Sequence, residues 1–340
     1  MSFSVALPPS RLRDSIIRCM AAQLVPIVRS SPGIGKTDIG HSIAKDFKLK
    51  LIDVRLGQAD ISDLNGLPRF TENGKAEFAP FSDFPLEDDP IPDGYRGWMI
   101  CFDELTSAPK QIQAAAYKIL LDRKVGQKKL HDKVVMLALG NKASDNAVVY
   151  EMSTALQSRM VHLELELSHK EWIDWAIKNN IDGRIIGYME FQPENLMTFK
   201  ADHSDHTYAC PRTWEFTNRL IQGKDVTLDD LPLLAGVISP GVAHSFIAFT
   251  TVYSQLPKLS VILSDPENAP LPDEPSMKYA MASYLAEQIN ATNVDKLVVY
   301  IARLPIEIQV VCLRMVNLRK SSLISHKEIQ KLFVNLMRYF

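Results

Sequence analysis

The chain has 340 residues, and at roughly 100–200 residues per domain this length predicts two or three domains. Hydrophobic residues make up 46% of the chain, which is enough to build a core. Lys and Arg total 38 and Asp and Glu total 40, so the formal net charge is −2. This balance excludes a strongly basic DNA-coating protein and a polyacidic tail protein, although a local basic patch is compatible with it.

The N-terminus lacks the basic, apolar and small-residue order of a signal peptide. No uninterrupted apolar run approaches the roughly 20 residues that a membrane helix needs. The 4 cysteines are scattered, without a C-x-x-C pair, which argues against a disulfide framework or a cysteine zinc site. We therefore expect a soluble, cytoplasmic protein that does not associate with a membrane.

In chain order, the first half alternates helices with buried strands. A short amphipathic helix is expected at 10–22, a strand at 24–28, a helix after residue 36 and a second strand at 49–56. The region 57–95 breaks this pattern and predicts a hairpin around Asn73-Gly74, followed by an acidic, extended loop that is solvated. Further strands are expected at 98–102, 134–139 and 161–165, with a helix that Ser107 caps and that begins near Pro109. A basic hairpin, 123–133, precedes the strand at 134–139.

After about residue 166 the strands disappear. Proline-rich residues 257–275 predict a rigid loop or linker. Helices are expected at 168–180, 182–191, 212–222, 227–236, 276–290, 293–303, 306–319 and 325–338. The fold class is therefore an α/β core followed by an all-helical region.

The segment after the first buried strand has the composition of a phosphate-binding loop. It reads Ser30-Ser31-Pro32-Gly33-Ile34-Gly35-Lys36-Thr37 and runs into a helix. Glycines allow backbone N–H groups to turn toward phosphate oxygens, and the helix N-terminus adds its positive end. Lys36 is expected to reach the β- and γ-phosphates of ATP, and Thr37 to ligate Mg²⁺. Ser30 departs from the pattern, because a glycine is expected there.

Two acids end the apolar strand Met99–Phe102. In phosphate-loop enzymes the first acid holds Mg²⁺ through water, a role that falls to Asp103. The next acid, Glu104, is then expected to polarise the water that attacks the γ-phosphate. Two acids at a strand end are also compatible with a simple cap, and the phosphate loop elsewhere in the chain favours the catalytic interpretation.

Three more polar residues are candidates to complete the site. Asn141 follows a buried strand, on the ligand edge of a parallel sheet, and is expected to orient the attacking water. Arg159 precedes the last strand and is suited to act as a finger on a neighbouring subunit's phosphate, with Arg123 as the first alternative. Arg212 opens a helix in the helical part and is expected to contact the γ-phosphate. The alternative interpretation of Asn141 is an ordinary turn, and that of Arg159 is a solvated surface arginine.

Together these motifs resemble the AAA+ ATPases, and more narrowly their MoxR-like and dynein-related branch, over roughly residues 5–223. The resemblance makes Ser30–Thr37 the Walker A motif, Ile100–Glu104 Walker B, Asn141 sensor 1, Arg159 the arginine finger and Arg212 sensor 2. Residues 60–66 with the following hairpin resemble that branch's insertion in helix 2. Residues 123–133 resemble its hairpin before sensor 1.

The resemblance implies a five-stranded parallel sheet flanked by helices, with a helical lid. It places the nucleotide-binding core at 1–165, the lid at 166–235 and a helical C-terminal region at 236–340. It further implies ATP and Mg²⁺ as cofactors, a homohexameric ring with ATP between subunits, a protein substrate, and a partner with a von Willebrand factor A-type domain. Arg212 is compatible with action in its own subunit or in the neighbour.

Two other functions remain open. A nucleic-acid motor, such as a helicase or a restriction-type translocase subunit, would use the basic hairpin as a collar around a phosphate backbone. A nucleotide-gated scaffold without turnover is disfavoured because Glu104 is present. A small polar cluster before Arg212 has spacing compatible with zinc, but polar residues are expected in such a loop; its members are Asp202, His203, Asp205, His206 and Cys210.

Overall fold

The computed structural model describes residues 5–145, 150, 152–202 and 205–337. The chain divides into two compact units. The first comprises Met1–Ser168 together with Lys200–Asp202, and the second comprises His169–Phe199 and His203–Phe340. The change from a mixed to a helical unit at Ser168 lies three residues after the end predicted for the core.

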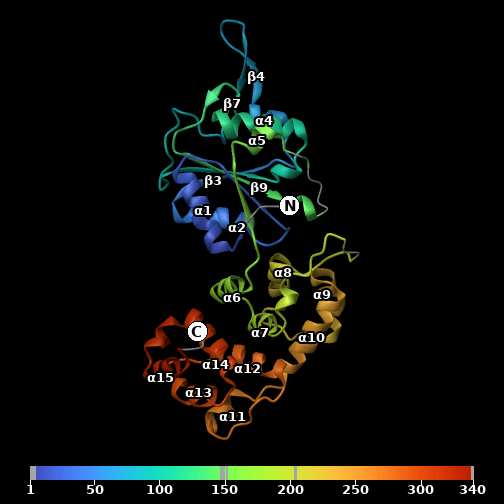
Figure 1. Cartoon of the computed structure of the whole chain (residues 1–340), viewed down its shortest axis with the longest axis vertical. Coiled ribbons are helices and arrows are strands. Elements are labelled where there is room, and N and C mark those ends of the chain that lie inside the picture. Colours follow the sequence, from blue (N-terminus) through green and yellow to red (C-terminus); the bar gives the residue numbers. More distant parts are fainter. Residues whose placement is uncertain (1–4, 146–149, 151, 203–204, 338–340) are drawn as a thin grey trace. The chain divides into compact units, whose positions relative to one another are not determined.

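The first unit is an α/β layer structure with one main sheet and two small hairpins (Figure 1). Its strands are β1 (Ala6–Leu7), β2 (Pro26–Ser30), β3 (Leu49–Arg55), β4 (Leu67–Phe70), β5 (Ala76–Ala79), β6 (Gly97–Asp103), β7 (Lys124–Val125), β8 (Lys128–Lys129), β9 (Val134–Asn141) and β10 (Val161–Leu165). Its helices are α1 (Pro9–Ala21), α2 (Lys36–Asp46), α3 (Ile61–Asn65), α4 (Lys110–Asp122) and α5 (Thr154–Gln157). Ser107 does not cap α4; it ends a short 3₁₀ turn, Leu105–Ser107, and Pro109 precedes the helix.

The main sheet has six strands in the order β1-β10-β2-β9-β6-β3, and all its strand pairs are parallel. Five of these strands are the expected ones. The sixth, β1, contributes only two residues at the edge next to β10. A segment this short has no hydrophobic pattern by which it could be predicted. In this order β2, which leads into the phosphate loop, lies between β10 and β9, so its end is flanked by two other strand ends.

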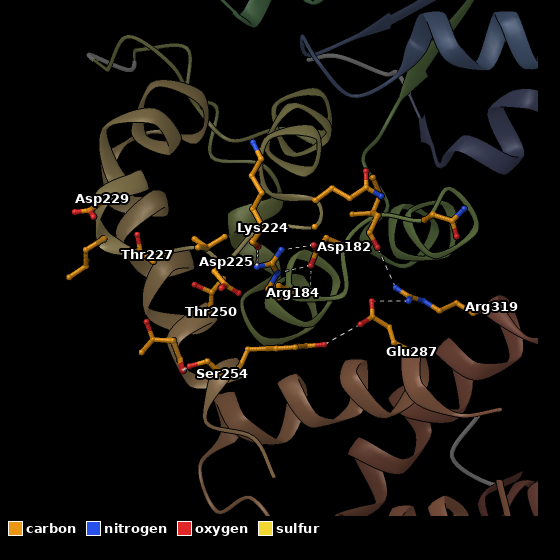
Figure 2. Close-up of a pocket in the computed structure, with 18 residues that line it drawn as sticks. Asp182, Arg184, Lys224, Asp225, Thr227, Asp229, Thr250, Ser254, Glu287 and Arg319 are labelled. Atoms are coloured by element: carbon orange, nitrogen blue, oxygen red, sulfur yellow. Dashed lines mark hydrogen bonds and ion pairs between the residues drawn. The ribbon is translucent and has the colours of Figure 1, made fainter. Parts of the chain in front are cut away.

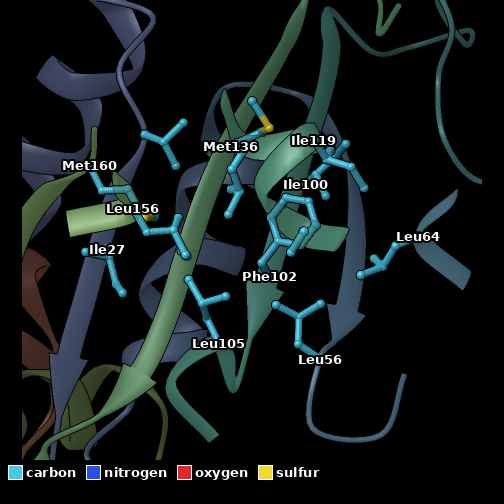
Figure 3. Packing of buried hydrophobic residues seen from close by; sticks show 14 of the residues in the cluster. Ile27, Leu56, Leu64, Ile100, Phe102, Leu105, Ile119, Met136, Leu156 and Met160 are labelled. Atoms are coloured by element: carbon cyan, nitrogen blue, oxygen red, sulfur yellow. The ribbon is translucent and has the colours of Figure 1, made fainter. Parts of the chain in front are cut away.

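Alternate residues of the central strands face opposite layers, as the two-residue period of a strand requires. Ile100 and Phe102 of β6 pack with Ile119 of α4 in one layer, shown in Figure 3. Met99 and Cys101 of the same strand pack in the other layer with α1 and α2. Because both faces are covered, β6 is buried along nearly its whole length, which accounts for its continuous apolar sequence.

Two hairpins depart from this layered core. The β4–β5 hairpin extends away from the rest of its unit (Figure 1), and its register places Phe70 and Phe78 on the same face. Phe70 is 83% exposed. The short β7–β8 hairpin turns at Gly126, and a Cβ on this glycine would lie 3.0 Å from the Cβ of Phe78 in β5. The two hairpins are therefore in contact.

The second unit is helical in its described residues. Its helices are α6 (His169–Lys178), α7 (Gly183–Phe191), α8 (Pro211–Ile221), α9 (Leu231–Ile238), α10 (Pro240–Ser254), α11 (Leu259–Ser264), α12 (Pro275–Gln288), α13 (Val294–Ile301), α14 (Ile306–Arg319) and α15 (Lys327–Leu336). An aromatic cluster lies at its centre, where Tyr188, Trp214 and Phe246 have ring centroids 5.3–5.7 Å apart.

The predicted division of the helical part at residue 235 does not coincide with a boundary between compact units. Residue 235 lies inside α9, and α9 packs against α10, so the expected lid and C-terminal region form one compact unit. The expectation of a helix-free linker at 257–275 is wrong in part. Pro257 and Pro266 flank α11 rather than interrupt it, and a proline outside a helix is no obstacle to the helix itself.

One described segment, Pro240–Ser264, passes a length and hydropathy test for a membrane-crossing helix, with a windowed mean hydropathy of 1.3. This differs from the expectation drawn from uninterrupted runs. In the structure the segment forms two helices, and α10 buries Phe246 and Phe249 in the helical unit. Core helices can have the same length and apolar composition. The four cysteines are free thiols and all are buried.

Candidate nucleotide-binding site

The predicted phosphate-loop residues lie at the carboxyl edge of the main sheet. Ser30, the last residue of β2, pairs with Asn141, the last residue of β9. Asp103 ends β6, the strand on the other side of β9. Parallel strands bring their C-terminal ends to the same edge, so three residues far apart in sequence are gathered in one place.

The phosphate loop turns through two glycines with left-handed backbone, Gly33 at φ 78° and Gly35 at φ 90°. Residues with a side chain rarely adopt this conformation, which accounts for both glycines. Gly35 directly precedes α2, so the loop ends at a helix N-terminus. Ser30 is buried and extended, as part of β2, and its hydroxyl donates to the Ser31 carbonyl oxygen at 2.9 Å. This position therefore does not require the glycine that the motif predicts.

Two hydrogen bonds connect the loop to the neighbouring strand ends. Lys36 Nζ donates to Asn141 Oδ1 at 3.0 Å. Thr37 Oγ1 donates to Asp103 Oδ2 at 3.1 Å. An ammonium group, a hydroxyl and a carboxylate thus converge at the start of α2. Hydroxyl and carboxylate oxygens are ligands that Mg²⁺ prefers, so Thr37 and Asp103 fit the metal role predicted for them.

Glu104 has an uncommon backbone, with φ 59° and ψ 26°. A non-glycine residue in the left-handed region costs conformational energy and is found where the surrounding structure holds it. Its amide N–H donates to Asp103 Oδ1 at 2.8 Å. Its carboxylate lies over Gly57, where a Cβ would overlap Oε2. Glu104 is thereby turned out of the strand direction that Asp103 follows.

Sequence patterns did not single out Thr106, which holds Asn141 in place. Thr106 is 2% exposed, and its hydroxyl oxygen accepts from the backbone N–H of Asn141 at 2.9 Å. Gly140 permits this contact, since a Cβ there would overlap the Thr106 side chain. A threonine near paired acids has no distinctive spacing, and only the sheet brings it beside β9.

Arg159 lies exposed between α5 and β10, where its Nη1 donates to the Ala155 carbonyl oxygen at 3.3 Å. Arg212 is exposed in the first turn of α8, which belongs to the helical unit. Its contact with the γ-phosphate stays a prediction.

Arg123, the alternative finger, is half-buried. It donates to the Val134 carbonyl oxygen at 2.7 Å, and burial lowers the pKa of its guanidinium. It therefore has a structural role between α4 and β9.

The basic hairpin and the acidic loop, predicted as separate surface features, lie against each other. The Glu87 amide N–H donates to the Lys129 carbonyl oxygen at 3.0 Å, and Lys129 Nζ lies 2.8 Å from Glu87 Oε1. Asp132 lies 3.5 Å from the same ammonium. These contacts raise the pKa of Lys129, chiefly through its hydrogen bond with Glu87. Part of the hairpin's positive charge is therefore balanced within the chain, while Lys124 and Lys128 are exposed.

A large cavity of about 1030 Å³ lies within the helical unit and was not anticipated (Figure 2). Its walls carry two ion pairs, Arg184 with Asp182 at 2.7 Å and Arg319 with Glu287 at 2.9 Å. Arg184 also caps the end of α8 by donating to the Ile221 carbonyl oxygen at 2.9 Å. These charged groups neutralise one another. Through Arg184 they connect α7 with α8, and through Arg319 they connect α14 with α12.

The cluster before Arg212 does not form a metal site in the part of the chain that the structure describes. No group of three or more His, Cys, Asp or Glu side chains that could hold a metal occurs among the described residues. His203, one member of the cluster, lies outside them. Cys210 is buried and caps α8 together with Thr213.

No protein-family model matches the chain, and no curated protein matches it significantly. Among solved structures it is similar to NtrX from Brucella abortus, with 12% identity, 97% of this chain and 68% of that chain covered, and a TM-score of 0.40. A point mutant of RuvB from Thermotoga maritima matches with 13% identity, coverage of 95% and 85%, and a TM-score of 0.39. The replication initiator DnaA bound to AMPPCP and single-stranded DNA matches with 12% identity, coverage of 99% and 97%, and a TM-score of 0.38. Likeness at this level carries no argument about function.

Proposed function

We propose that this chain is an AAA+ ATPase of the MoxR-like and dynein-related branch, which binds ATP with Mg²⁺ and hydrolyses it. The observation that carries the proposal is the pair of contacts Lys36–Asn141 and Thr37–Asp103 at the start of α2. They bring the carboxylate of Asp103 and the amide of Asn141, from the ends of β6 and β9, to the cation and the hydroxyl in the first turn of α2, an arrangement that favours phosphate binding.

Each residue then has a defined task. The backbone N–H groups of Ser31, Gly33, Ile34 and Gly35 surround the phosphates, with Pro32 shaping the loop, and Lys36 balances the charge on the β- and γ-phosphates. Thr37 and Asp103 would hold Mg²⁺, which neutralises phosphate charge when bound. Glu104 accepts a proton from the attacking water, and Asn141 orients that water. Thr106 holds the backbone of Asn141, and Lys36 contacts its side-chain oxygen, which supports the orienting role.

Assembly and substrate belong to the same proposal. Arg159 is exposed, which suits a residue offered to the next subunit of a homohexameric ring. Arg212 contacts the γ-phosphate in its own or the neighbouring site. The substrate is a protein, and a von Willebrand factor A-type partner follows from the family resemblance. The ring acts in the cytoplasm as a remodelling chaperone or activator.

The second candidate function is a nucleic-acid motor. The exposed Lys124 and Lys128 support it. The pairing of Lys129 with Glu87 and Asp132 weakens it, because a basic collar needs cations free to meet phosphates. Binding to single- and double-stranded DNA, measured against salt concentration, separates the two functions. Tight binding that falls steeply with salt would favour the motor.

Mixing two inactive variants tests the ring with a shared site. Lys36→Ala lacks a working phosphate loop, and Arg159→Ala lacks the finger. A mixed ring brings the intact loop of the second variant against the intact Arg159 of the first, so ATP hydrolysis should return. If mixed rings form, as shown by co-purification of differently tagged chains, and no hydrolysis returns, Arg159 does not act between subunits.

A further inference from the structure

Four hydrogen bonds form a closed ring beside the phosphate loop. Arg29 Nη1 donates to His162 Nδ1 at 2.8 Å, and His162 Nε2 donates to the Gln157 carbonyl oxygen at 2.8 Å. Gln157 Nε2 donates to the Met152 carbonyl oxygen at 2.8 Å. Arg29 Nη2 closes the ring by donating to Met152 Sδ at 3.2 Å. We call these four residues the Arg29 ring.

The ring joins two parts of the proposed site that are far apart in sequence. Arg29 immediately precedes Ser30, where β2 gives way to the phosphate loop. Gln157 and His162 stand on either side of Arg159, two residues before it and three after it. The strand pairing of β2 with β10 sets this arrangement, with Glu164 opposite Arg29. Arg159 is thus an exposed residue within a short segment that is held at both ends.

The partners in the Arg29 ring determine which nitrogen of His162 carries the hydrogen. A guanidinium only donates, so His162 Nδ1 is the acceptor and Nε2 carries the hydrogen. Arg29 is a cation on a central strand, and burial lowers its pKa while Glu164 opposes that shift. Glu164 itself pairs with Lys142, the residue after Asn141. Burying part of an arginine whose guanidinium donates to an imidazole and a thioether costs free energy, so packing alone does not account for this residue.

We infer that Arg29 is a positioning residue for Arg159: it holds the segment 152–162 so that the finger is presented to the neighbouring subunit. The inference rests on the proposed role of Arg159 between subunits. Because Arg29 is part of the strand that carries the phosphate loop, the subunit's own loop and the finger it offers its neighbour share one rigid support.

The first test is Arg29→Met, which keeps an unbranched, flexible side chain and removes the guanidinium with its hydrogen bonds. ATP binding by calorimetry and the KM for ATP should stay near those of the unaltered chain, while kcat falls about 10²-fold, less than the roughly 10³–10⁵-fold that an arginine finger supplies. Arg29→Lys, which can still donate to His162, should retain most of the activity. Arg18→Met, on the exposed side of α1, is the matched control and should leave kcat unchanged.

Mixing experiments separate a finger defect from a loop defect. Arg29→Met mixed with Lys36→Ala should regain hydrolysis, because the intact loop of the first meets the well-placed Arg159 of the second. Arg29→Met mixed with Arg159→Ala should regain none, since neither offers a working finger. The opposite pattern would assign Arg29 to its own phosphate loop and overturn the inference, as would full activity of Arg29→Met or no return in either mixture.

The mixture of Lys36→Ala with Arg159→Ala serves as the reference. If it fails, the role of Arg159 between subunits falls, and this is distinguishable from failure of Arg29 alone. If Arg29→Met does not fold, exposed His162 gives the same test. His162→Phe should reproduce the finger defect in both mixtures. His162→Asn, whose Oδ1 can replace Nδ1 as acceptor, should keep most of the activity; equal loss in both variants would overturn the inference.

Discussion

The carboxylate of Glu104 lies against the backbone of Gly57, so closely that a methyl group on Gly57 would overlap Glu104 Oε2. Gly57 follows β3, and Glu104 follows β6, the strand that pairs with β3. The left-handed backbone of Glu104 turns its side chain in this direction. The absence of a side chain at position 57 is therefore what allows the proposed general base its place.

Gly57→Ala should impair turnover without impairing ATP binding. The added methyl group displaces the flexible end of Glu104 and leaves the phosphate loop intact, so we expect a fall in kcat of about 10-fold or more, within the range for a misplaced general base. Steady-state hydrolysis and calorimetric ATP binding measure the two effects. Gly236→Ala, with open space around its Cα, is the control and should leave both unchanged.

Glu104→Gln should keep ATP binding and lose turnover by about 10²–10⁴-fold. The amide preserves the size of the side chain but does not accept the proton of the attacking water. Single-turnover hydrolysis measures the effect. Near-normal hydrolysis would show that another residue polarises the water, and the Gly57→Ala result would then need a different cause.

Lys36→Ala should bind ATP far more weakly or not at all. It removes the cation that the loop directs at the phosphates, and it also removes the hydrogen bond to Asn141. Isothermal calorimetry in the presence of Mg²⁺ measures the loss. Lys45→Ala, in the last turn of the same helix, controls for the change of charge. Unchanged affinity in Lys36→Ala would contradict the whole site assignment.

Replacing Lys128 and Lys129 with Ala should leave basal hydrolysis within a few-fold of normal. Both side chains are exposed, and the pair between Lys129 and Glu87 is a surface salt bridge that adds little stability. Basal ATP hydrolysis at saturating ATP is the measurement. Complete loss would make the hairpin a structural part of the site rather than a surface for substrate.

Phe102→Ala should destabilise the first unit by about 3–5 kcal/mol, because the ring is fully buried and its loss leaves a cavity between the sheet and α4. Calorimetric unfolding measures the effect in the transition that ATP raises, since ligand binding identifies the unit that holds the site. Phe70→Ala, at a side chain 83% exposed, is the matched control and should change stability little.

The local parts of the site could be predicted from the amino-acid sequence. Gly33, Gly35, Lys36 and Thr37 were predictable because a phosphate loop is a continuous segment, with its glycines and its helix start in a row. The buried strands were predictable for a similar reason, since a strand covered on both faces is apolar throughout, as 98–102 is. The edge strand β1 and the short helices α3, α5 and α11 carry too few residues for a periodic pattern.

Which distant residues meet could not be predicted, because this depends on how the elements pack in three dimensions. The order of the parallel strands places Asn141 and Asp103 beside Lys36 and Thr37, and no spacing along the chain encodes that order. The contacts of Gly57 with Glu104, and of Arg29 with His162, depend on backbone angles and strand register. Hydrophobic periodicity specifies which face of an element is buried, but it leaves open what lies on the other side, because burial is non-directional whereas hydrogen bonds and close backbone approach depend on position.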